Sequence, residues 1–203
     1  MPSIAKWKGT APIVRQIHDS LQGRLSAELA TISAGLFTSP TWDHITLAAP
    51  DTDAAYWRTA QFDDPPPEAY HTPSIGVVVG ESNVVDGGGL GEWLVETEFL
   101  ISAWLSEADN GAQTKQDSAE VGDAYVSGVF NVLSAHLKDD AESDSTSGTS
   151  LGLGLPVVYV RPNGYSPVTP LNFEFDDAGR PIGPWFYVGE VALAVGHHTY
   201  QAG

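Results

Sequence analysis

Apolar residues recur at helical spacing near the start of the chain. From Thr10, the sequence TAPIVRQIHDSLQGRLSAELATIS places apolar side chains at steps of four and three: Ile13, Ile17, Leu21, Leu25, Leu29 and Ile32. That spacing puts them on one face of a helix. Thr10 can cap the first turn, and Pro12 is tolerated there because its missing N–H would be unpaired anyway. The pattern predicts a long amphipathic helix.

Two segments in the middle of the chain have the character of strands. Residues 74–79 form an apolar run, and residues 94–105 alternate between two faces. One face of the second segment belongs to a core, whereas the other is half apolar and half acidic, which suits a surface covered in part by another subunit. The glycine cluster at 87–91 matches neither G-x-G-x-x-G nor G-K-[ST], so it is not a phosphate-binding loop. We interpret it as the flexible connection of a hairpin.

A second helical stripe follows in residues 113–138. Its apolar members are Val121, Tyr125, Val129, Val132, Leu133 and Leu137. Gly122 and Gly128 weaken this helix intrinsically, so tertiary packing must hold it, and a small residue allows close approach to a strand. Residues 138–154 are rich in Ser, Gly and acidic residues, a composition that predicts a mobile loop.

Three further strands are expected after this loop, at residues 155–160, 171–175 and 185–195. The last two flank the turn sequence DDAGRPIGP and are predicted to form a hairpin. The final strand is apolar on both faces, which is typical of a central position in a sheet.

Residues 35–72 differ in character from the rest of the chain. Five prolines exclude long regular elements, and several aromatic residues give the segment apolar weight. We predict a long, mostly extended arm packed by its aromatics, in which residues 43–47 are a candidate strand. Because so long a connection is uncommon in a compact domain and usually functional, the arm is expected to reach a neighbouring molecule.

The predicted order is helix, arm, strand, strand, helix, strand and hairpin. It indicates an α+β fold: a mostly antiparallel mixed sheet with two long helices packed on one face, plus the extended arm. With 203 residues the chain suits one domain, residues 1–203.

Charge narrows the classes of function. Nine Lys and Arg residues stand against 26 Asp and Glu residues, and the net charge of −17 opposes binding to nucleic acid or to an anionic membrane. An acidic surface still suits a channel through which DNA slides without sticking. The chain has no cysteine, and neither a signal peptide nor a membrane span is predicted, so we expect synthesis in a reducing cytoplasm.

Signatures of catalysis and metal binding are weak. Glu96 and Glu98 share one side of a predicted strand, and Glu190 lies on a candidate neighbour, but solvated or interface carboxylates are the favoured interpretation of this pair. The alternating acids of residues 140–144 lack the glycine and the glutamate of a calcium loop, and the histidines lack metal-site spacing. No catalytic residue, metal site or cofactor is predicted.

The order of these segments resembles that of the tail-terminator and neck proteins of tailed bacteriophages. The resemblance is carried by an N-terminal helix, the segment YHTPSIGVVVGES, the acid-bearing strand LVETEFLISAW and a helix with the stripe VxxxYVxxVxxxL. It spans residues 70 to about 137, with residues 185–195 in support.

The resemblance implies a non-enzymatic virion protein of the tail or neck. It would assemble as a ring, with a hexamer as the expected form, on the last ring of tail-tube protein, stop tube growth and meet the head connector. DNA would pass through without being gripped. Candidate interface residues are Trp42, Trp57, Trp104 and Trp185, and candidate channel-facing acids are Asp86, Glu96, Glu98, Asp139, Asp140 and Asp144.

Two alternatives stay open. The first is another virion part, such as a head–tail stopper, a connector or a tube protein. The second is an acidic domain that binds or hydrolyses carbohydrate through its tryptophans and carboxylates.

Overall fold

The computed structural model describes residues 10–38, 42–59, 71–87, 92–107, 109–142, 157–172 and 174–200. The elements are α1 (Ala11–Leu36), η1 (Ala54–Tyr56), β1 (Trp57–Thr59), β2 (Ser74–Gly87), β3 (Glu92–Ser106), η2 (Asp109–Gly111), α2 (Lys115–Glu142), β4 (Val157–Leu171) and β5 (Phe186–Tyr200). None of the helices in these ranges is long and apolar enough to cross a membrane.

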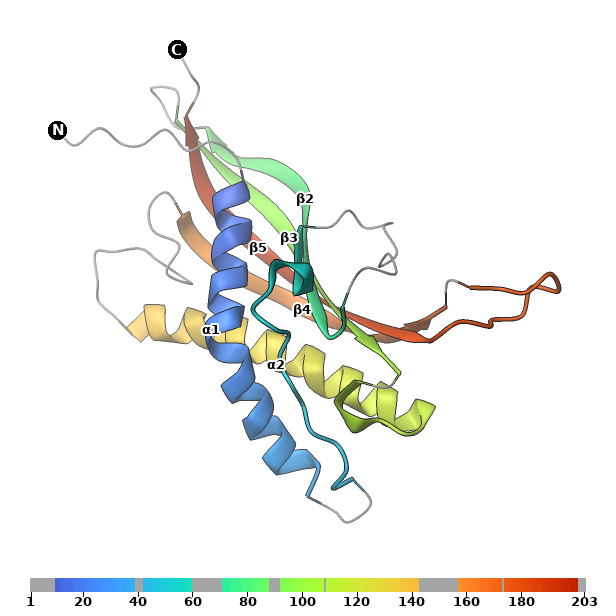
Figure 1. The fold of residues 1–203 in the computed structure, drawn as a ribbon. Coiled ribbons are helices and arrows are strands. Elements are labelled where there is room, and N and C mark those ends of the chain that lie inside the picture. The colour runs from blue at the N-terminus through green and yellow to red at the C-terminus, as the bar shows by residue number, and fades with distance from the viewer. Residues whose placement is uncertain are drawn as a thin grey trace.

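The strands form one mixed sheet in the order β1-β2-β3-β5-β4. β1 runs parallel to β2, and the remaining neighbours pair antiparallel. Both long helices cover the same face of the sheet, with α2 crossing α1 (Figure 1). The predicted α+β fold, its two helices on one face and the interior position of the last strand are therefore confirmed.

The core lies between the helices and the sheet. The predicted stripe of α1 is buried, with no exposed surface at Ile13, Ile17, Leu21, Leu25 or Leu29. The stripe of α2 meets the same core through Val121, Tyr125, Val129 and Leu133. Burying such faces removes apolar surface from water, which is the main favourable term in folding.

Glycines set how closely α2 approaches its neighbours. A Cβ at Gly122 would lie 2.8 Å from Val168 Cγ1 on β4, which confirms the predicted close approach to a strand. At Gly128 the neighbour is α1 instead, since a Cβ there would lie 2.8 Å from Leu29 Cδ2. On the sheet side, a Cβ at Gly189 of β5 would collide with Val126 Cγ2.

Asp117 holds the start of α2. Its Oδ2 accepts hydrogen bonds from the backbone N–H groups of Gln113 (3.0 Å) and Thr114 (3.1 Å), and it lies 3.2 Å from His44 Nε2. These bonds, with that of Gln113 the largest cause, lower the pKa of Asp117 to about 2. At α1, by contrast, Thr10 occupies the N-cap position without a side-chain hydrogen bond, so the predicted cap is wrong.

The last two strands are longer than predicted. β4 is one strand from Val157 to Leu171 that contains Pro162, Pro167 and Pro170, where two separate strands were expected. Because β4 is an edge strand and carries three register shifts, prolines are tolerated in it. β4 and β5 then continue into a hairpin that projects from one end of the sheet (Figure 1). We call residues 174–185 the hairpin arm.

The segments between the elements depart from the predictions in two places. Residues 43–47 are not a strand; the sheet is extended instead by β1, which pairs with β2. Residues 138–142, predicted as the start of a mobile loop, belong to the last turns of α2. The rest of that loop, and residues 39–41 and 60–70 of the predicted extended arm, lie outside the described residues.

Candidate functional site

The face of the sheet opposite the helices, which we call the open face, carries the side chains that β3 points away from the core. At one end of this face Arg58 of β1 lies over the ring of Trp104, with its Cζ 5.6 Å from the ring centroid. Trp104 Nε1 donates to Ser102 Oγ at 3.1 Å. A cation on an aromatic face is attracted by the ring quadrupole, so Arg58 stays over the ring of Trp104. These two residues of the chain occupy this end of the open face.

The other end of the open face carries an ion pair. Glu96 accepts a hydrogen bond from the hydroxyl of Tyr159 at 2.7 Å and pairs with Arg161 at 3.2 Å. The hydrogen bond to Glu96 raises the pKa of Tyr159. The ring of Tyr159 lies against Gly196, where any Cβ would collide with it.

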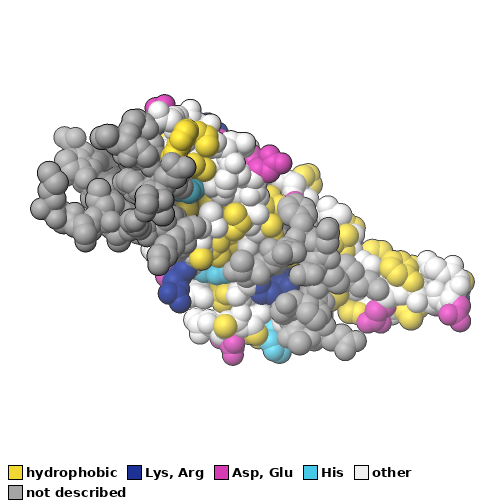
Figure 2. All heavy atoms as spheres, turned by 90° about the horizontal axis from the view of Figure 1, so that it is seen from above, with side chains coloured by type: hydrophobic (Ala, Val, Ile, Leu, Met, Phe, Trp, Pro, Cys, Tyr) yellow, Lys and Arg dark blue, Asp and Glu magenta, His cyan; other side chains and the backbone are white. Residues whose placement is uncertain are grey.

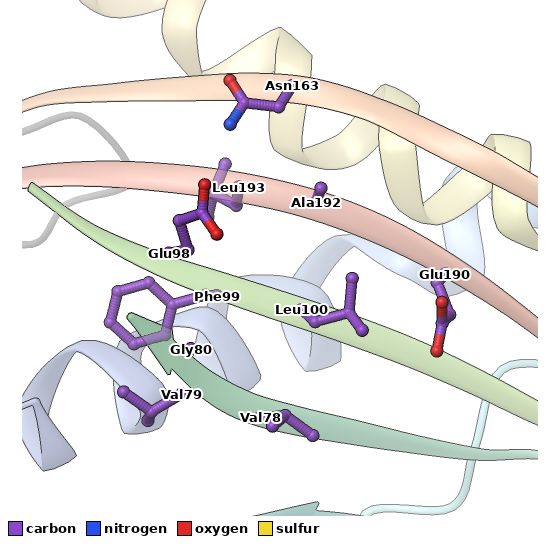
Figure 3. A pocket seen from close by; sticks show the side chains of 10 residues that line it. All are labelled: Val78, Val79, Gly80, Glu98, Phe99, Leu100, Asn163, Glu190, Ala192 and Leu193. Carbon is purple, nitrogen blue, oxygen red and sulfur yellow. The ribbon is translucent and has the colours of Figure 1, made fainter. Parts of the chain in front are cut away.

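Between these two ends lies a hollow of about 590 Å³. It is lined by Val78, Val79, Gly80, Glu98, Phe99, Leu100, Asn163, Glu190, Ala192 and Leu193. Figure 3 shows Leu100 between the two carboxylates, with Glu98 toward one end of the hollow and Glu190 toward the other. The open face therefore has an apolar floor with an acid on each side of it.

The two carboxylates of the hollow differ in burial, since Glu98 is exposed and Glu190 is partly buried. Partial burial raises the pKa of Glu190. Neither Glu98 nor Glu190 makes an ion pair within the described part of the chain, in contrast to Glu96. An acid that has lost solvent without gaining a partner favours a ligand that brings a positive charge.

Among the described residues, no three His, Asp or Glu side chains are grouped so that they could hold a metal ion. No Ser, His or Lys is among the described residues that line the hollow. Its chemistry is that of a binding surface: an apolar centre, an amide and two acids.

The four predicted tryptophan anchors have different surroundings. Trp57 and Trp104 are each only 8% exposed, so they present little surface to a partner, and their role at an interface stays a prediction. Trp57 donates to the carbonyl of Asp51 at 2.6 Å. Trp42 and Trp185 are partly buried against the core, and Lys115 lies 4.4 Å above the ring of Trp185.

The predicted channel-facing acids are scattered over the fold. Asp86 is exposed near the end of β2, and Glu98 lines the hollow. Glu96 is paired with Arg161, so its charge is partly neutralised, and its place in a channel lining stays a prediction. Asp139 and Asp140 belong to the last turns of α2, and Asp144 lies outside the described residues.

The hairpin arm contains the turn that the sequence predicted, but its projection from the sheet was not predicted. It exposes two large apolar side chains, Phe175 at 56% and Ile182 at 64%. Figure 2 shows the arm standing clear of the body with apolar side chains along it and acids at its end. The sequence feature that could have indicated such an arm is the turn sequence DDAGRPIGP with an apolar residue on each side. Exposed apolar residues on a hairpin are typical of contact surfaces.

Neither the protein-family models nor the curated proteins include a match to this chain.

Proposed function

We propose that the chain is a structural, non-enzymatic subunit of a tailed-phage tail or neck. In this role it forms a closed ring, with a hexamer as the expected form, that caps the tail tube and joins it to the head. The observation that carries the proposal is the order of the long elements, helix α1, strands β2 and β3, helix α2, and strands β4 and β5, with the VxxxYVxxVxxxL stripe of α2 buried against the sheet. That order is the one on which the resemblance to tail-terminator and neck proteins rests.

Two surfaces of the fold support an assembly role. The open face has an apolar hollow beside two acids that make no ion pair within the described part of the chain, and the hairpin arm exposes apolar side chains away from the body. Exposed apolar surfaces of this kind are uncommon in monomeric proteins. A ring subunit needs two different, complementary surfaces, because head-to-tail contacts between them close into a ring.

The charge of the chain is compatible with a lumen that DNA traverses. A net charge of −17 disfavours contact with phosphates, so DNA would pass without being held. Glu98 and Asp86 are exposed and remain candidates for such a lining.

Two measurements test the proposal: the location of the protein in virions, and the length of tails that assemble without it. Antibody raised against the chain should label the head-proximal end of the tail, one site per particle. Tails assembled without the protein should lack a defined length. Label along the whole tail would favour the tube-protein alternative, and label absent from particles would overturn the proposal.

The carbohydrate alternative predicts retention on a polysaccharide column. The burial of Trp57 and Trp104 weighs against it, because sugar platforms present aromatic faces to solvent. Trp42→Ala and Trp185→Ala are the variants that would abolish such retention if it occurred.

A further inference from the structure

The hollow of the open face suits an apolar side chain that arrives together with positive charge. Leu100, Val78 and Ala192 give it apolar lining, and Glu98 and Glu190 lie on either side of Leu100 (Figure 3). Its volume of about 590 Å³ lies within the ~300–1,000 Å³ common for binding pockets. Because neither acid makes an ion pair within the described part of the chain, a cation on the occupant would be attracted by both.

The Lys and Arg side chains of the described body have other surroundings. Two are in ion pairs with acids of the same chain, and two lie over tryptophan rings: Arg161, Arg180, Lys115 and Arg58. Arg15 and Arg24 belong to α1, which covers the opposite face of the sheet (Figure 1). The cation that the hollow favours is therefore to be sought outside the described residues.

Residues 1–9, which lie outside the described residues, have the composition that the hollow favours. Their sequence MPSIAKWKG places Lys6 and Lys8 on either side of Trp7. No Asp or Glu occurs before Asp19, whereas Lys138 stands in the acidic run KDDAESD. In a chain with a net charge of −17, the start of the sequence thus combines positive charge with a tryptophan, the residue type most often found as the anchor of an interface.

The segment is long enough to reach a neighbouring copy. Nine extended residues span at most about 30 Å. The described chain begins at Thr10, directly before α1, and α1 packs on the helix side of the sheet. Within one copy the sheet therefore lies between the start of α1 and the hollow (Figure 1). The open face of a neighbouring copy is not separated from the segment in this way, so a second copy is the source of the occupant.

We infer that the Lys6–Lys8 segment of one copy docks in the open-face hollow of the next copy, with Trp7 on the apolar floor and its flanking lysines facing the two acids. The inference rests on the proposed function, in which copies form a ring, and names a contact that joins them. Because the segment and the hollow are different surfaces, the contact is head-to-tail, and its repetition gives a closed ring or an open helix according to the rotation between copies.

Thiol cross-linking tests this contact directly, since the chain has no cysteine of its own. Ala5→Cys is activated as its mixed disulfide with thionitrobenzoate and mixed with Ala192→Cys, and release of thionitrobenzoate is followed. We expect release at least about tenfold faster than with the control partner Gln22→Cys on the exposed side of α1. Rates equal to the control would overturn the inference. Asn163→Cys on β4 replaces Ala192→Cys if the latter does not fold.

The competing occupant is the same segment of the same copy. A chain that carries both Ala5→Cys and Ala192→Cys would then form its disulfide at a rate independent of protein concentration. The mixed single variants would react no faster than the control. This pair of results would overturn the contact between copies.

Charge exchange tests the ionic half of the contact. Changing Lys6 and Lys8 together to Glu should raise the dissociation constant for self-association about tenfold or more. Adding Glu98→Lys and Glu190→Gln reverses the charge of the hollow and should restore most of the lost affinity. The matched control makes the same change of charge at the exposed positions of α1, with Arg15→Glu and Arg24→Glu. Equal weakening by the control, or no recovery in the combined variant, would show that the segment does not meet these acids.

These outcomes separate the contact from the function. Closed rings that form without the cross-link between Ala5→Cys and Ala192→Cys would leave the proposed function standing and overturn the inferred contact. Open filaments that carry the cross-link would support the contact and contradict the capping role.

Discussion

At the scale of single residues, Asp117 joins two distant parts of the chain. It receives the first free N–H groups before α2 and lies beside His44, which is 73 positions earlier in the sequence. A carboxylate is favoured at a helix N-terminus both by these donors and by the helix dipole. Asp117 therefore fixes the segment before the sheet to the start of the second helix.

The pKa of Asp117 gives a prediction for stability against pH. Its value of about 2 in the folded chain lies below the ordinary value of 3.8, so the carboxylate stabilises the fold above about pH 4 and this contribution is lost as the pH falls toward 2. Asp117→Asn should lower the melting temperature at pH 7, and the difference from wild type should shrink between pH 4 and pH 2. A difference in melting temperature that stays constant from pH 4 to pH 2 would contradict this role of Asp117.

Tyr125 gives a second prediction at the residue scale. Its side chain is fully buried, and its hydroxyl has no hydrogen-bond partner within the described part of the chain. Burial raises its pKa well above 10. An unpaired buried hydroxyl costs about 1 kcal/mol or more, so Tyr125→Phe should raise the free energy of unfolding by about 1 kcal/mol. Tyr165→Phe, at a half-exposed position, should change it little in the same denaturant titration.

At the scale of elements, the fold depends on how closely α2 lies on the sheet. Gly189 leaves room for Val126, and Gly122 leaves room for Val168. Valine in a helix has one strongly preferred rotamer, so Val126 cannot turn aside from an added methyl group. These glycines therefore set how closely α2 approaches the sheet.

Gly189→Ala tests this packing. The added methyl group would overlap Val126, and overpacking of this kind costs about 1–3 kcal/mol. Gly23→Ala is the control, because nothing lies within 4 Å of a Cβ at that position of α1, and alanine should stabilise the helix by up to about 1 kcal/mol. Equal stability of the two variants in thermal unfolding would show that α2 tolerates displacement.

The elements also show what the sequence could and could not predict. The helical stripes of α1 and α2 were predictable because burial follows the 3.6-residue period. The length of β4 was not predictable from the sequence. Prolines interrupt a central strand but are tolerated in an edge strand, and whether a strand lies at the edge depends on the tertiary fold. The burial of Trp57 and Trp104 was unpredictable for a similar reason: aromatic residues serve cores and interfaces alike. The hollow was not predictable either, because its lining comes from four strands, β2, β3, β4 and β5, that only the folded sheet brings together.

At the scale of the whole molecule, the net charge of the chain opposes self-association, whereas its apolar surfaces favour it. Every copy carries a net charge of −17, so copies repel at long range, whereas the apolar side chains exposed in the hollow and on the hairpin arm favour contact between copies. Salt screens the long-range repulsion strongly and a partly buried ion pair weakly.

Association should therefore strengthen with salt. Raising the ionic strength from about 0.01 M to about 0.15 M shortens the screening length from about 30 Å to about 8 Å. We expect the mass-average size in analytical ultracentrifugation to rise over that interval. A fall in size over the same interval would show that surface ion pairs, and not the apolar centre, hold the copies together.

The ring is the central claim, and native mass of the purified protein across a concentration series, with negative-stain images of the largest species, tests it most directly. We predict closed rings of a single size, with six subunits as the expected number and a visible lumen. Open filaments of variable length, or a strict monomer that also fails to bind the end of isolated tail tubes, would contradict it.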